Sequence, residues 1–145
     1  MSTVAGLSQW LDRHRQPTLA VLLSGLSDEQ RPLVEEARAT LGSVAGVTES
    51  IAWRGLPWRW CLCYSGGNGR PGEFAWIVPD PNGPFTALSL AEEAIAQVTL
   101  ESLPKSVRHG VLHGNIVGAR RWVMVPLDSP SSARDIGALA ATARA

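Results

Sequence analysis

The sequence predicts an α+β domain in which helices pack on one face of an antiparallel sheet, itself a meander plus a late strand. Helical periodicity dominates before residue 45, and short alternating segments then follow one another up to residue 90 with only turns between them. Segments with helical periodicity return near the end of the chain and enclose one last strand. Consecutive strands joined by turns pair antiparallel, whereas a parallel sheet requires strands that alternate with helices.

The length of the chain fits one domain. Its 145 residues allow a single hydrophobic core that needs no disulfide or metal to hold it together. We therefore predict one domain spanning residues 1–145, with residues 1–6 as a loose N-terminal tail.

Three helices are expected in the first third of the chain. Ser8 can cap a short helix that continues through Arg15, and the helix that follows starts near Pro17 and stops at Gly25. Ser27 and Gln30 have the spacing of a capping box for the third helix, which ends at Gly42. The apolar stripe of this third helix consists of Leu33, Val34, Ala37 and Leu41.

The middle of the chain predicts strands, at residues 49–53, 58–64, 73–79 and 84–90. Glycine-rich residues 65–69 and the Asp-Pro-Asn-Gly sequence at 80–83 are turn signals between them. Strict alternation in segment 58–64 places Arg59, Cys61 and Cys63 on one face of the sheet. The opposite face then carries Trp58, Trp60, Leu62 and Tyr64.

The last third predicts a helix at 91–98, a second helix from Pro104 to about His113, a strand at 120–127 and a final helix. Ser132 and Asp135 have the spacing of a capping box, which predicts that the final helix begins near Ser132. Its apolar face is formed by Ile136, Leu139, Ala140 and Ala143.

Charge and targeting signals predict a cytoplasmic protein. Thirteen basic residues balance thirteen acidic ones, so the chain offers no electrostatic surface for nucleic acid or an anionic membrane. Residues 1–6 lack the features of a signal peptide, and the longest apolar run, residues 19–23, is too short to span a bilayer. Cys61 and Cys63 are two residues apart on one strand, a spacing that disfavours a disulfide between them.

Residues 50–57, Ser-Ile-Ala-Trp-Arg-Gly-Leu-Pro, follow a helix that opens with Leu-Ser-Asp-Glu-Gln. This stretch resembles the YdhG-like bacterial domains of unknown function, in which a helix precedes a Trp/Tyr-Gly-x-Pro turn and a strand. Gly83-Pro84-Phe85, the helix from Ala91, Leu103-Pro104 and the segment from Trp122 to Ile136 are similar to the related family catalogued as domain of unknown function 3788. The resemblance covers residues 18–144. It implies a cytoplasmic α+β domain and carries over no catalytic residue.

The same resemblance implies an iron-chaperone function, which some YdhG-like proteins are described as having. Hard cations need clustered carboxylates, whereas the acidic residues of this chain are dispersed. The pairs Glu35-Glu36 and Glu92-Glu93 lie on predicted helices, where neighbours in sequence point apart. We therefore expect no metal and no cofactor.

Cysteine and histidine provide the remaining chemical groups. His109 and His113 lie four apart on a predicted helix and would complete a Cys2His2 set with Cys61 and Cys63. The Cys-x-Cys spacing is not typical of zinc sites, and we interpret the cysteines as small packed hydrophobes and the histidines as surface residues. Cys63 with His113 is the one pair that suggests a nucleophile and a base, and neither lies in a catalytic signature. The sequence favours a non-catalytic domain over an enzyme.

The chain is rich in tryptophan, with six in 145 residues. Five of them fall on predicted strands or at strand ends: Trp53, Trp58, Trp60, Trp76 and Trp122. Each tryptophan can bury roughly 150–250 Å², so five rings are more bulk than one small sheet face needs. Either they fill a thick core, or some of them line a cavity in which a flat ligand stacks.

These observations lead to a ranked set of functions. The leading hypothesis is a cavity that binds a small apolar or aromatic molecule, with Arg59 and Glu73 available to orient it. The expected wall of that cavity consists of Trp53, Trp58, Trp60, Tyr64 and Trp76. The alternative is a protein-interaction module that forms a homodimer and keeps the tryptophans in its core. An enzyme with an unrecognised polar pair is the third hypothesis.

Overall fold

The computed structural model describes residues 9–144 of the chain. Within them, six strands form one antiparallel sheet in the order β1-β2-β3-β4-β6-β5. The strands are β1 (Val47–Trp53), β2 (Trp60–Gly66), β3 (Glu73–Val78), β4 (Phe85–Ala91), β5 (Asn115–Val117) and β6 (Arg120–Pro126). The helices are α2 (Leu19–Ser24), α3 (Gln30–Gly42), α4 (Glu92–Ala96), α5 (Lys105–Leu112) and α6 (Pro130–Ala143), with a 3-10 turn at Leu100–Ser102. The predicted α+β architecture is confirmed.

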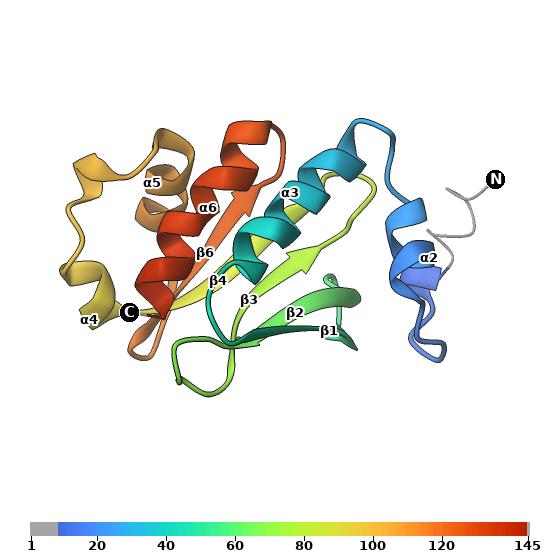
Figure 1. The fold of residues 1–145 in the computed structure, drawn as a ribbon, viewed down its shortest axis with the longest axis horizontal. Coiled ribbons are helices and arrows are strands. Elements are labelled where there is room, and N and C mark those ends of the chain that lie inside the picture. Colours follow the sequence, from blue (N-terminus) through green and yellow to red (C-terminus); the bar gives the residue numbers. More distant parts are fainter. Residues whose placement is uncertain (1–8, 145) are drawn as a thin grey trace.

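Helices α3, α5 and α6 lie across one face of the sheet, with α3 beside α6 (Figure 1). The cross-strand register places Leu62, Ile77, Thr86 and Val125 in one row that faces these helices. Gly110 of α5 packs so closely on Val123 and Val125 that an added Cβ would lie 3.1 and 3.4 Å from their methyl groups. The main core therefore lies between the helices and this face of the sheet. Across residues 9–144, no helix combines the length and the apolar character needed to cross a membrane.

Two polar arrangements hold α3 in place. The predicted capping box is present, since the Ser27 hydroxyl accepts from the Gln30 amide at 3.1 Å and the Gln30 side chain accepts from the Ser27 amide at 2.9 Å. Arg38 of α3 donates to Glu49 of β1 at 2.8 and 2.9 Å, and the Tyr64 hydroxyl donates to the same carboxylate at 2.6 Å. The Arg38 hydrogen bonds lower the pKa of Glu49, because they stabilise its charged form.

The start of α6 differs from the prediction. Ser129, not Ser132, is the N-cap, and Ser132 occupies the third helical position of the box. Ser129 has extended backbone angles, φ −153° and ψ 155°, and is followed by Pro130, whose ring suits the first helical turn. The predicted apolar face is confirmed, because Ile136, Leu139 and Ala140 are buried.

Three other elements differ from the sequence expectations. The first helical segment covers only residues 9–11 of the described chain, and its predicted cap, Ser8, lies outside the described residues. Strand β2 begins at Trp60 instead of Trp58, because Arg59 adopts a positive φ of 62° that breaks the extended backbone. Strand β5 was not predicted, since three exposed residues give no measurable alternation.

The buried face of α6 allows a stability test. Leu139 is 2% exposed, whereas Leu112 at the end of α5 is 57% exposed. Leu139→Ala should lower the free energy of unfolding by about 2–5 kcal/mol, because it removes core contacts and leaves a cavity. Leu112→Ala, a matched control, should change it by less than about 0.5 kcal/mol. Denaturant titration followed by circular dichroism measures both, and equal effects would mean that α6 does not pack as described.

Candidate functional site

The sheet face that the helices leave open carries a four-ring aromatic cluster. It consists of Trp58, Trp76, Phe85 and Trp122, here called the aromatic cluster. Trp76 and Trp122 stack with ring centroids 5.0 Å apart and planes 29° from parallel. Trp58 lies 5.9 Å from Trp76 and 6.2 Å from Trp122 and Phe85, so it contacts all three other rings. Geometries of this kind are the favoured ones for aromatic pairs.

Small side chains on β4 explain how rings from two non-adjacent strands can stack. Trp76 of β3 pairs with Ala87 of β4, and Trp122 of β6 pairs with Ser89 of β4. Because cross-strand partners point to the same face, Ala87 and Ser89 lie between the two tryptophans. Neither small side chain obstructs the rings, so the indoles close over β4 and bury it. Ala87 is 0% exposed and Ser89 is 3% exposed.

Trp58 reaches this face because the loop between β1 and β2 reverses direction. Gly55 has a φ of 79° and Arg59 a φ of 62°. The loop is closed by the Arg54 amide, which donates to the Arg59 carbonyl at 2.9 Å, and by the Arg59 amide, which donates to the Gly55 carbonyl at 2.6 Å. The break at Arg59 places Trp58 on the face opposite to Trp60, although they are two residues apart.

The remaining predicted wall residues lie on the helix-covered side. Trp53 and Trp60 form an edge-to-face pair at 5.8 Å, and the Trp60 indole donates to the Asp12 carbonyl at 2.8 Å. The Arg59 guanidinium lies 5.5 Å from the centre of the Trp10 ring. Tyr64, whose pKa burial raises, donates to Glu49. The structure therefore divides the predicted ligand site. Trp58 and Trp76 of the predicted wall meet on the open face with Glu73, whereas Trp53, Trp60, Tyr64 and Arg59 do not.

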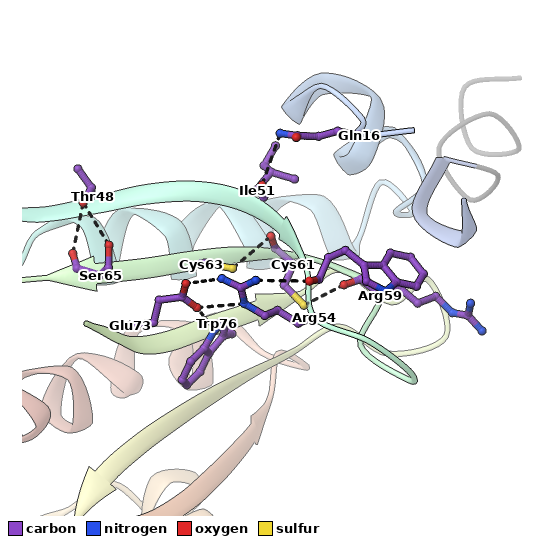
Figure 2. Close-up of polar contacts among 11 residues, drawn as sticks. Gln16, Thr48, Ile51, Arg54, Arg59, Cys61, Cys63, Ser65, Glu73 and Trp76 are labelled. Atoms are coloured by element: carbon purple, nitrogen blue, oxygen red, sulfur yellow. Dashed lines mark hydrogen bonds and ion pairs between the residues drawn. The ribbon is translucent and has the colours of Figure 1, made fainter. Parts of the chain in front are cut away.

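Glu73 lies between Arg54 and Trp76, which is one ring of the aromatic cluster (Figure 2). Glu73 Oε1 accepts from the Trp76 indole nitrogen at 2.7 Å and from Arg54 Nε at 3.2 Å. Arg54 Nη2 forms an ion pair with the second carboxylate oxygen. The Arg54 guanidinium lowers the pKa of Glu73, so the carboxylate is charged at neutral pH and orients the indole of Trp76.

Cys61 and Cys63 lie on the same open face and are completely buried. Burial is the largest cause that raises the pKa of Cys63 to about 11, and it raises the pKa of Cys61 further. Thiols in this state are poor nucleophiles and poor metal ligands. His109 lies on α5 and His113 directly follows that helix, on the other side of the sheet, so the Cys-His combinations considered from the sequence do not assemble. Among the described residues, no group of three or more metal-binding side chains is present.

An open hollow of about 570 Å³ adjoins the aromatic cluster, here called the apolar hollow. Phe85 belongs to both, since it lines the hollow and lies against Trp58. The hollow forms where the start of β4 meets the end of β6 and the first turn of α3. Its apolar lining includes Leu33, Pro84, Phe85, Met124, Pro126 and Leu127, and Glu29, Gln30 and Asp128 provide polar groups. Sequence reasoning missed these residues because they come from three separate segments and share no motif.

Comparison of the chain with models of known protein families, with curated proteins and with solved structures gives no match in any of the three. The resemblance to the YdhG-like domains stays a prediction. The site is therefore interpreted from its own geometry.

The state of the buried thiols can be measured directly. With a pKa of about 11 for Cys63, the native protein should contain very little thiolate at pH 8. Reaction with Ellman's reagent should be at least about a hundredfold slower for the folded protein than for the urea-unfolded protein, which is the control. Rapid labelling of either cysteine under native conditions would contradict the burial described for this face.

Proposed function

We propose that this domain binds a small molecule with an apolar or aromatic body in the apolar hollow beside the aromatic cluster. The observation that carries the proposal is the size and lining of the hollow. Its volume of about 570 Å³ lies within the roughly 300–1,000 Å³ typical of small-molecule sites. Such sites combine a mostly apolar wall with a few polar groups, which is the composition found here.

The polar groups of the hollow favour a particular kind of ligand. Glu29 and Asp128 lie in its lining, and within the described part of the chain neither carboxylate forms an ion pair. A ligand with a cationic or hydrogen-bond-donating group would pair with them. Phe85 provides a ring on which an aromatic body would pack, and Trp58 packs edge-to-face against that ring.

The proposal is one of binding, and the two cysteines, which are buried and do not line the hollow, have no part in it. We also propose that the domain works in the cytoplasm. Cys61 and Cys63 are free thiols, a state that a reducing compartment maintains.

The proposed site can be tested with the fluorescent probe N-phenyl-1-naphthylamine, which has an aromatic body and an amine. Gly83 lines the hollow, and a Cβ built there meets nothing within 4 Å. Gly83→Phe should therefore fill the hollow without straining the backbone. We expect probe affinity to fall about tenfold or more, since a pocket-filling side chain removes the burial that stabilises the complex.

Gly42→Phe is the matched control. Gly42 ends α3 away from the hollow, and a Cβ there also meets nothing within 4 Å. This variant should bind the probe like the wild type, and both variants should keep the wild-type circular dichroism spectrum. Undiminished probe binding by Gly83→Phe would show that the hollow is not the binding site.

The homodimer alternative is favoured by one feature, the exposed edge strand β5. It lies at the end of the sheet, and its apolar residues Ile116 and Val117 are 57% and 63% exposed. Unpaired edge strands with apolar side chains readily pair with a second chain. Only three residues make up this strand, so the edge that it offers to a partner is short.

Sedimentation velocity tests this alternative. If β5 forms a dimer interface, the wild type should show concentration-dependent dimers and Ile116→Lys should remain monomeric, because a charge on the edge opposes pairing. Thr48→Lys on β1, the opposite edge strand, is the control and should dimerise like the wild type. A wild type that stays monomeric at high concentration would exclude the dimer.

A further inference from the structure

A second hollow, of about 370 Å³, lies at the other end of strands β4 and β6 and is lined by three arginines. Arg70 comes from the loop between β2 and β3, Arg120 begins β6, and Arg144 follows the last turn of α6. We call this hollow the arginine pocket. It shares no lining residue with the apolar hollow.

Arg144 is the one charged residue among those described that is buried, with 6% of its surface exposed. Its guanidinium stacks over the Phe74 ring at 4.4 Å, and its Nη2 donates to the Gly72 carbonyl at 2.7 Å. Its Nε is buried and has no hydrogen-bond partner. The side chain is thus held in one position with donor capacity to spare.

Arg120 is also held in position. Its Nε donates to the Ser89 hydroxyl at 2.6 Å and its Nη2 to the Ser89 carbonyl at 2.8 Å. These contacts are with neutral groups, so they orient the guanidinium and leave its charge uncompensated. Within residues 9–144, no carboxylate lies within 4 Å of Arg70, Arg120 or Arg144.

Two partly buried arginines elsewhere in the protein provide a contrast. Arg38 and Arg121 each form an ion pair with a glutamate. Burying a cation without an anion is unfavourable, and bringing like charges together adds to the cost. Desolvation and, after it, the charges of Arg120 and Arg70 lower the pKa of Arg144. If Arg144 served only to pack on Phe74 and to bond Gly72, there would be no reason for two further arginines to lie beside it.

We propose that the arginine pocket binds the phosphate group of a small phosphorylated molecule. Planar guanidiniums donate two hydrogen bonds at a time to phosphate oxygens, and the pocket supplies three of them. The pocket is large enough for more than the phosphate, and Gln97 and Thr142 in its lining suit the hydroxyl groups of a small organic body. Among the described residues that line the pocket, Glu93 is the one carboxylate, so their positive charge exceeds the negative.

The shape of this charged region favours a small molecule over nucleic acid. A nucleic-acid surface tracks several phosphates along an extended basic stripe. Here the three arginines converge on one concavity in a chain whose formal net charge is zero. The pocket therefore matches a single phosphate group.

Isothermal titration calorimetry tests the proposal, with inorganic phosphate and glycerol 3-phosphate as probes and potassium chloride added to equal ionic strength. We expect saturable binding of both, tighter for glycerol 3-phosphate. Arg70→Gln should weaken binding about threefold or more, because it removes a charge that faces the anion. Arg70 is exposed, so this variant should fold normally. Glu93→Gln should tighten binding, because it removes the opposing charge.

Arg134→Gln is the matched control, since it removes the same charge from an exposed position of α6 that does not line the pocket. It should bind the probes like the wild type. If Arg70→Gln and Arg134→Gln weakened probe binding equally, the loss of affinity would reflect net charge alone, and the proposal would be overturned. Absence of binding would overturn it as well. Equal binding of sulfate would replace the phosphate assignment with a general anion site.

Discussion

The stacking of Trp76 on Trp122 is the interaction on which the open face of the sheet depends. An antiparallel sheet can leave one face in contact with water, but here aromatic side chains of the sheet cover the face opposite the helices. The two indoles do so by meeting over Ala87 and Ser89, and Trp58 covers the pair from the loop between β1 and β2. Cys61 and Cys63 are consequently buried on a face that no helix of residues 9–144 covers. The same arrangement brings Phe85 to the rim of the apolar hollow.

The backbone conformation of Arg59 determines on which face of the sheet Trp58 lies. A continuous strand through residues 58–64 would put Trp58 beside Trp60, as alternation predicts. The left-handed backbone at Arg59, with φ 62°, reverses that assignment. Residues other than glycine rarely adopt this conformation, so no sequence pattern predicts it. Trp60 and Trp76 are both buried, at 6% and 7% exposure. Trp60 packs with Trp53 on the helix-covered side, whereas Trp76 packs with Trp58 on the open face.

The parts of the fold that the sequence predicts are those set by local periodicity and local hydrogen bonds. The Ser27–Gln30 capping box and the buried stripe of α3 are examples, because each involves residues within one or two turns. The predicted start of α6 is wrong because Ser129 and Ser132 can each serve as an N-cap. The proline that follows Ser129 favours Ser129 as the cap. Both hollows were missed for a different reason. Leu33, Phe85 and Met124, like Arg70, Arg120 and Arg144, come together only when distant segments pack.

Strands β4 and β6 connect the two hollows. Because these strands are antiparallel, the start of β4 meets the end of β6 at the apolar hollow, and their other ends meet at the arginine pocket. Along β4, Ser89 lies between the two hollows. Its small side chain leaves room for the stacked indoles, and its hydroxyl accepts from Arg120. A larger residue would separate the rings, whereas alanine would remove the hydrogen bond from Arg120 Nε and leave only the one from Nη2 to the backbone carbonyl. A small hydroxyl side chain at position 89 therefore serves both the aromatic cluster and the arginine pocket.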